Sequence, residues 1–273
     1  MVRKLFKHEL LFYWRLILPV QIALLGVALL GRFTQLFEAD TVVYDVVSTG
    51  TIIIFALSAV ASLLLTTIFC IVRFYKNLFS GEGYLTFTLP VSPTKHLVVK
   101  LLTAVLMELL AFFGVCLSIC VITDTGMLIE IGKALGFLYD QAGEVLGADR
   151  VHLAIYFVEL GVLYLVNCFY QVLVLYLCIA LGQLFHKNRV FAAVGMFFAY
   201  FLITQIITTI VSSIFSSLFF NISSLIDLVY FVGRHPYATI HILFIAAIVI
   251  SAGLAILFFF LTRWIIRRKL NLE

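Results

Sequence analysis

Long runs of apolar residues are the feature that most constrains how this chain can fold. Several runs carry almost no charge over the roughly 20 positions that a helix needs to cross a bilayer. Hydrophobic residues make up 64% of the sequence and charged residues only 12%, with a mean hydropathy of +1.17. A soluble domain is about 45 to 50% apolar and about 25% charged. The sequence therefore predicts an all-α integral membrane protein.

Six runs are long enough to span a membrane. Beside six spans, the 273 residues leave no room for a soluble catalytic domain of the usual size of about 100 residues or more. We therefore expect a single transmembrane domain over residues 1–273. The predicted transmembrane helices cover residues 16–31, 48–72, 97–122, 152–185, 190–217 and 240–262.

The segments outside these spans differ in character. Residues 1–15 place apolar side chains on one side of a helix and basic ones on the other, which predicts an amphipathic helix at the membrane interface. Residues 123–151 are rich in acids and form an outer segment. Residues 219–236 are apolar but interrupted by polar positions, so we expect a re-entrant or interfacial pair of helices there.

The distribution of charge predicts the orientation. Fourteen of the 18 lysines and arginines lie in the N-terminal arm, in the segment 73–100, in the turn 186–189 or in the tail after residue 262. The opposite side holds four basic residues and most of the acids. Because positive loops stay in the cytoplasm, both termini are expected to be cytoplasmic. The net charge of +4 comes from these basic cytoplasmic segments, so it predicts no nucleic-acid partner.

Motifs that would give this chain its own chemistry are missing from the sequence. It has no GxxxxGK[ST] phosphate loop, and no HExxH, GxSxG or CxxC motif. The five cysteines all lie in apolar runs, where a thiol behaves as a small hydrophobic group, so we expect neither a disulfide framework nor a metal site. We expect no enzyme activity and no ATP hydrolysis from this chain alone.

Two acids lie inside predicted spans. Glu108 is in the third span and Glu159 is in the fourth. Counting from opposite surfaces, the two lie at similar depths, within roughly 4 Å of each other along the membrane normal. An ionisable residue in the hydrocarbon core marks a functional site by default. The alternative is that each is protonated, or is hydrogen-bonded to a neighbouring helix for structure alone.

Polar side chains also form stripes on two of the apolar helices. Such stripes either line a cavity or hold helices together, and the second use is the commoner one. The stripe on the fourth span and the stripe on the fifth, with Glu108, make up the candidate translocation cavity. Its members are Glu108, Tyr156, Glu159, Asn167, Tyr170, Gln205 and Thr209, while the stripe on the fifth span continues to Ser212 and Ser216.

The segment 73–96 is the longest polar interruption on the basic side and is predicted to be a cytoplasmic loop. Its start combines Phe74, Tyr75, Leu78 and Phe79 with basic residues at helical spacing. Gly81 and Gly83 then end the short amphipathic helix. Membrane anchoring is the simplest role for such a helix.

The sequence YKNLFSGEGYLTFTLPVSPTKHLVVKLL at residues 75–102 resembles that of ATP-binding-cassette exporter permeases. The similarity is to the six-span type-2 family, especially its members from Gram-positive bacteria. The amphipathic arm, the interrupted segment after the fifth span and the basic tail 267–273 agree with the resemblance. The two outer segments match no pattern that we can assign to a particular substrate.

The resemblance implies a membrane subunit of an ATP-driven exporter in a bacterial plasma membrane. In that family two permeases, identical or homologous, pair with two cytosolic ATPase subunits, which bind ATP and Mg²⁺, so no cofactor is expected in this chain. The loop between spans two and three docks on the ATPase as a coupling helix, and the N-terminal arm is the elbow helix. Carried over here, the ATPase interface comprises Tyr75, Lys76, Asn77, Leu78, Phe79 and Glu82.

An amphiphilic substrate, such as a peptide, lipid or drug, would suit an apolar cavity with scattered tyrosine, asparagine and glutamate. Two other functions stay open at this point. One is a permease-like sensor or immunity subunit that binds an outer ligand and signals through the ATPase. The other is a proton-coupled secondary transporter that uses Glu108 and Glu159 as a relay, although the spans and loops show no inverted repeat.

Overall fold

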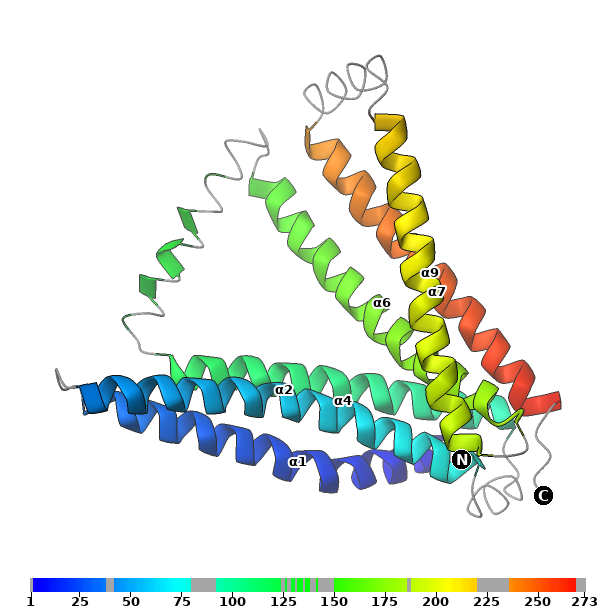
Figure 1. Ribbon diagram of the computed structural model, residues 1–273, viewed down its shortest axis with the longest axis horizontal. Coiled ribbons are helices and arrows are strands. Elements are labelled where there is room, and N and C mark those ends of the chain that lie inside the picture. Colours follow the sequence, from blue (N-terminus) through cyan, green and yellow to red (C-terminus); the bar gives the residue numbers. More distant parts are fainter. Residues whose placement is uncertain are drawn as a thin grey trace. The chain divides into compact units, whose positions relative to one another are not determined.

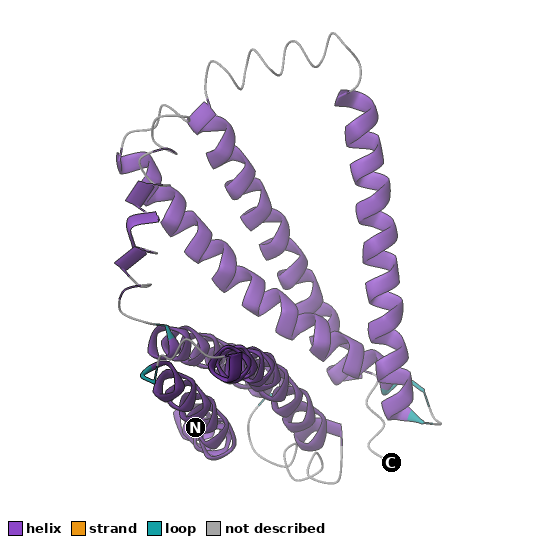
Figure 2. Cartoon of the chain, turned by 60° about the vertical axis from the view of Figure 1, so that its left-hand side comes forward, coloured by secondary structure: helices purple, strands orange, loops and turns teal. Residues whose placement is uncertain are grey.

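The computed structural model describes residues 2–37, 42–79, 92–123, 150–185, 188–219 and 236–268, with scattered positions between 126 and 141. Within these ranges the long elements are all helices and no strand occurs (Figure 2). The long helices are α1 (Val2–Gln35), α2 (Val42–Phe79), α4 (Pro93–Ile122), α6 (Arg150–Gly182), α7 (Arg189–Phe219) and α9 (Pro236–Arg268).

Six helices are long and apolar enough to cross a membrane, which confirms the predicted class. The chain is a multi-span helical membrane protein. Each predicted span lies in one of these helices, and only the span 152–185 runs past its helix, by three residues. The helices are longer than the predicted spans because lipid offers the backbone no hydrogen-bond partner. A helix therefore continues until water or a turn can bond to the backbone groups at its end.

The chain divides into two compact units. The first comprises residues 1–135 and contains α1, α2 and α4, whereas the second begins at Gly136 and contains α6, α7 and α9. In the first unit α1 packs against both α2 and α4, and the three helices run side by side (Figure 1). In the second unit α6 packs against both α7 and α9. The central helix is therefore α1 in one unit and α6 in the other.

The first unit has a small apolar core near the end where α1 stops. Leu24 and Ala28 of α1, Phe55 of α2 and Ile122 of α4 form one buried cluster. Gly31 allows this close approach, since a Cβ atom at that position would lie 2.7 Å from the Cδ1 atom of Ile122. The core thus depends on small residues of α1 facing larger side chains of its neighbours.

The N-terminal arm is part of this three-helix unit. Residues 2–15, predicted as an interfacial helix, form the first turns of α1, which continues without a break through Pro19 to Gln35. On this arm Glu9 is only 4% exposed, and Tyr13 is fully buried. The side of the arm that bears them packs against protein, and Lys4 and Lys7 stay exposed.

The start of α4 is defined by Ser92 and Pro93. Ser92 has an extended backbone (φ −63°, ψ 144°), and its carbonyl accepts a hydrogen bond of 2.9 Å from the Lys95 amide. Proline suits the first helical position because its missing amide would have no partner there. The helix therefore begins inside the predicted loop 73–96, and the first residues of that loop, 73–79, belong to α2. Residues 80–91 lie outside the described ranges.

The segment 219–236, predicted to be re-entrant, also lies outside the described residues apart from its two ends. Phe219 ends α7 and Pro236 begins α9. Most of the outer segment 123–151 and the tail after Arg268 fall outside them as well.

In the second unit, α6 and α7 approach each other closely where they are joined. A Cβ atom on Gly182 would lie 2.6 Å from the backbone nitrogen and Cα of Ala193. Asn188, which precedes α7, has a positive φ of 58°, a conformation that asparagine tolerates better than most residues. Because the contact at Gly182 is with backbone, the neighbour cannot move aside by a change of rotamer.

We expect Gly182→Leu to destabilise the second unit by about 1 to 3 kcal/mol, the usual cost of forcing extra atoms into a packed contact. Thermal unfolding in detergent monitored by circular dichroism would measure the change. Gly161→Leu is the matched control, because a Cβ atom at Gly161 of the same helix meets nothing within 4 Å. Equal stability of the two variants would contradict the close approach.

Candidate functional site

The carboxylate of Glu9 is the centre of a buried polar cluster in the first unit. Its Oε1 atom accepts hydrogen bonds from Lys100 Nζ and from Asn77 Nδ2, both at 2.9 Å. Its Oε2 atom accepts one from Arg73 Nε at 3.2 Å. We call Glu9, Arg73, Asn77 and Lys100 the Glu9 cluster. It joins α1, α2 and α4 through a single side chain.

Burial makes these bonds strong. Glu9 is 4% exposed, Lys100 2% and Asn77 7%, whereas the Arg73 side chain is 21% exposed. Removing a charged group from water costs several kcal/mol, and the cost is offset only when the partners and their geometry are good. Here one carboxylate receives three donors from two other helices. Loss of the carboxylate would leave Lys100 and Arg73 as like charges in the same buried site.

Neighbouring side chains hold the members of the Glu9 cluster in place. The guanidinium of Arg73 lies over the ring of Phe12, with 3.8 Å between its Cζ atom and the ring centroid, so a cation–π contact orients it. His96 is 1% exposed and comes one turn before Lys100 on α4. Arg73 is thus held by Phe12 as well as by Glu9, and Lys100 lies in a buried part of α4.

The cluster fastens both ends of the predicted coupling loop. Arg73 and Asn77 lie in the last two turns of α2, before residues 80–91, and Lys100 lies two turns into α4. We call residues 73–79 and 93–100 the two stems of the loop. Glu9 is a residue of α1 and binds both stems, so it connects the two stems to α1. A force applied to the loop therefore acts on three helices at once.

The predicted ATPase-interface residues differ in exposure. Lys76 is exposed and Tyr75 is half-buried, whereas Asn77, Leu78 and Phe79 are buried within the first unit. Phe79 packs edge-on against Phe74, with ring centroids 5.7 Å apart, and Asn77 belongs to the Glu9 cluster. Glu82 lies outside the described residues. Of the predicted interface residues that the structure describes, Tyr75 and Lys76 are thus the two that reach the surface.

The candidate cavity residues fall in both units. Glu108 belongs to the first, where its Oε1 atom accepts a hydrogen bond of 2.8 Å from Thr67 Oγ1 of α2. Glu159 belongs to the second, where its Oε1 atom lies 2.8 Å from His241 Nδ1 of α9. Each acid therefore has a partner within its own unit.

In the second unit, the stripe on α6 faces α9 and α7. The ring of Tyr156 lies against that of His241 in a tilted arrangement, with ring centroids 4.4 Å apart, so Tyr156, Glu159 and His241 form one group. Tyr170 stacks on Phe258 of α9 and shares a hydrogen bond between hydroxyl groups with Tyr200 of α7. Asn167 is half-buried on the same helix.

On α7, by contrast, the predicted stripe faces outward. Gln205 and Thr209 are both exposed, and the Thr209 hydroxyl donates a bond of 2.8 Å to the Gln205 carbonyl of its own helix. None of the residues in the apolar window of α7 is buried. This surface of α7 is available to lipid or to another chain.

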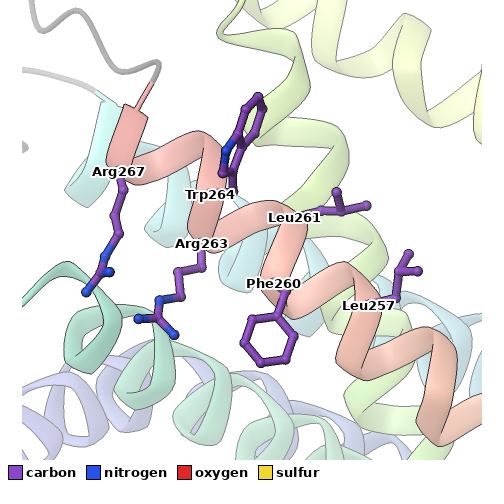
Figure 3. A pocket seen from close by; sticks show the side chains of 6 residues that line it. All are labelled: Leu257, Phe260, Leu261, Arg263, Trp264 and Arg267. Atoms are coloured by element: carbon purple, nitrogen blue, oxygen red, sulfur yellow. The ribbon is translucent and has the colours of Figure 1, made fainter.

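A surface pocket lies near the C-terminal end of α9. In Figure 3, Arg263 and Arg267 extend to the same side of the helix, and Trp264 lies on the other side. Tryptophan and arginine are typical of the membrane interface, where an aromatic ring meets head groups and a cation can reach water. The described residues that line this pocket are Leu257, Phe260, Leu261, Arg263, Trp264 and Arg267.

Nothing in the described part of the chain groups three or more histidine, cysteine, aspartate or glutamate side chains closely enough to hold a metal ion. The five cysteines are free thiols. The polar sites described above are therefore sites of hydrogen bonding and charge.

Sequence reasoning missed Glu9, Lys100 and His241 as site residues. Glu9 is the only acid in the basic arm 1–15, and His241 is the only ionisable residue of the predicted span 240–262. Each of these two residues is an exception in its segment, and this could have identified it as a candidate site residue. Lys100 gave no such signal, because it counted as one more basic residue at the cytoplasmic side. Its pairing with Glu9 depends on how α1 and α4 pack.

Compared with known proteins, the chain matches no family model, no curated protein and no solved structure.

We expect Glu9→Gln to lower the free energy of unfolding by about 3 to 5 kcal/mol, because it leaves two buried cations without their carboxylate. Chemical denaturation in detergent would measure the change. Glu130→Gln removes an exposed acid and serves as the control.

Adding Lys100→Met to Glu9→Gln should recover part of the loss, since one of the two like charges is then gone. If the double variant is as unstable as the sum of the two single changes, the carboxylate and the ammonium group do not interact.

Proposed function

We propose that this chain is the membrane-spanning permease subunit of an ATP-driven exporter. One observation carries the proposal: Glu9 binds Arg73 and Asn77 on one stem of the cytoplasmic loop and Lys100 on the other. A loop that serves only to connect two spans needs no buried ionic cluster at its base. A loop that must transmit force to helices does, because flexible stems would absorb the displacement.

The motor in this proposal is a separate cytosolic ATPase. The sequence has no phosphate-binding loop, so ATP and Mg²⁺ would be bound by that subunit. Two ATPases that close around nucleotide would push on the coupling loops of two permeases. The Glu9 cluster would then pass the displacement to α1, α2 and α4 as one body. Transport outward follows when a cavity between the permeases opens to the other side.

The second permease, a copy or a homologue, would pack against surfaces that are apolar and uncovered within this chain. The side chains of α7 supply such a surface, since Phe198, Leu202 and Ile206 are between 58% and 60% exposed. Lipid would cover what the partner does not. The membrane in the proposal is a bacterial plasma membrane, with both termini on the cytoplasmic side.

The class of substrate proposed is an amphiphile, such as a peptide, a lipid or a drug. The polar side chains inside the second unit are few and lie among apolar surfaces, as in the pair of Tyr170 and Tyr200. A substrate with both apolar and polar parts would match such surroundings better than a sugar or an ion. The tyrosine and acid groups of α6 would contact its polar part.

The ATPase would contact the exposed face of the first stem. Lys76 is exposed and Tyr75 half-buried, so an aromatic ring and a cation both reach the surface there, and such residues dominate binding energy at interfaces. Phe79 is 7% exposed and packs within the first unit. A charge at Phe79 would therefore disturb folding as well as docking, which makes Lys76 the better residue for a test.

We expect Lys76→Glu to reduce transport-coupled ATPase activity at least about tenfold, because a reversed charge at an interface repels the groups that had attracted the original one. The complex would be purified from native membranes through a tag on this chain, its ATPase identified by mass spectrometry, and its ATP hydrolysis measured in proteoliposomes.

Lys133→Glu makes the same change at an exposed position on the segment expected at the opposite side, and should leave the activity unchanged. Membrane insertion of both variants is checked by their yield. The proposed function would be overturned if Lys76→Glu and Tyr75→Ala each retained full ATPase activity. It would also be overturned if the purified complex contained no ATPase.

A further inference from the structure

The C-terminal end of α9 has an apolar face that ends in two arginines. All six described residues that line the pocket there belong to α9, and Phe260 extends to the same side of the helix as Arg263 and Arg267 (Figure 3). These three residues are spaced by three and by four positions, so they follow one another along one face. This face therefore offers an aromatic ring and then two guanidinium groups, which are one turn apart.

A second strip of side chains lies beside the first. Leu257, Leu261 and Trp264 are again spaced by four and by three positions, and all three are exposed. The far side of the helix is closed, because Thr262 and Ile266 are buried. Packing on the far side fixes the rotation of α9 about its axis. The face that bears the two strips is left to whatever surrounds the protein, which for a membrane-spanning helix is lipid.

The two arginines lie where the apolar part of α9 ends. The apolar span runs from Ala238 to Arg267, so Arg263 is roughly 6 Å deeper than the last residue of the span, at 1.5 Å per residue. Hydrocarbon meets the phosphate groups of the lipids at this level, and tryptophan, here Trp264, is typical of it. The guanidinium groups are thus at the level of the phosphates, and the strips of apolar side chains continue into the level of the acyl chains.

No described carboxylate neutralises the two guanidinium groups. The sequence of α9 contains no acid between Pro236 and Arg268. Within the described ranges, the side chains of Arg263 and Arg267 make neither an ion pair nor a hydrogen bond. Arg263 is only partly exposed, and a charge next to hydrocarbon is costly without a counter-ion. An anion that comes from the membrane would remove that cost.

We propose that this face of α9 is a binding site for an anionic phospholipid. Arg263 and Arg267 bind its phosphate, because a guanidinium group presents its donors in a fork that matches phosphate oxygens. One acyl chain of the lipid runs along Phe260 and the neighbouring leucines. A zwitterionic lipid binds less well, since its phosphate already has a cation beside it. The site requires neither ATP nor the coupling loop, so it is separate from the proposed export function.

Quenching of tryptophan fluorescence by brominated lipids tests this site on the full chain. The sequence has two tryptophans, so Trp14→Phe leaves Trp264 as the single reporter. The protein is reconstituted in bilayers of phosphatidylcholine and phosphatidylglycerol, with bromine on the acyl chains of one lipid at a time. At equal mole fractions, phosphatidylglycerol should bind about five- to thirtyfold more tightly, since each basic residue at the surface contributes a factor of about five.

The arginines are tested by a pair of substitutions. Arg263→Gln together with Arg267→Gln should bring the ratio of the two lipid affinities close to unity. The matched control is Lys4→Gln with Lys7→Gln, which removes the same charge from exposed positions of α1 and should leave the ratio unchanged. The proposal is overturned if the parent chain shows no preference for the anionic lipid. It is also overturned if the lysine pair lowers the preference as much as the arginine pair, because the effect would then belong to the basic surface in general.

A competition experiment distinguishes a lipid from a soluble phosphate. Glycerol phosphate carries the head group of phosphatidylglycerol's parent lipid without acyl chains, so an excess of it should leave the quenching of Trp264 unchanged. Displacement of the brominated lipid by glycerol phosphate would overturn the proposal in favour of a soluble ligand. The comparison of the two lipids on the parent chain needs no arginine variant. Failure of this proposal would leave the export function standing, because none of these experiments involves the ATPase.

Discussion

Lipid cannot hydrogen-bond a polar side chain, and this constraint governs the polar contacts between helices that the described residues make. Each acid inside a predicted span has a partner on another helix: Glu108 on α2 through Thr67, and Glu159 on α9 through His241. The Glu9 carboxylate has partners on two helices. Polar side chains thus act as fixed points that decide which helix faces lie together, while apolar surface fills the space between them.

The two best-defined polar sites differ in how completely they are satisfied. Both oxygens of the Glu9 carboxylate accept hydrogen bonds, and the charged donors are themselves held by Phe12 and by burial. The carboxylate of Glu159 has one oxygen paired and the other buried without a partner. The Glu9 carboxylate is thus satisfied at both oxygens and the Glu159 carboxylate at one.

Several properties of the chain follow from its sequence alone. Six apolar runs predicted six helices, because a backbone in lipid must satisfy its own hydrogen bonds whatever the helices pack against. The start of α4 at Pro93 was not predicted, because residues 93–96 were assigned to the loop, although proline at the first helical turn is a local rule. The arm at 1–15 was harder: its pattern of apolar and basic residues suits a membrane surface and a helix bundle equally well.

Which side chains meet was decided only by the tertiary structure. Glu9 and Lys100 are 91 residues apart, and nothing local in the chain distinguishes their pairing from a lysine exposed at the cytoplasmic surface. Leu78 and Phe79 are likewise buried, although their apolar pattern suited a docking surface. Composition and periodicity determine that a segment is a helix in a membrane. The rotation of each helix about its axis depends on all its neighbours together, and that rotation selects the site.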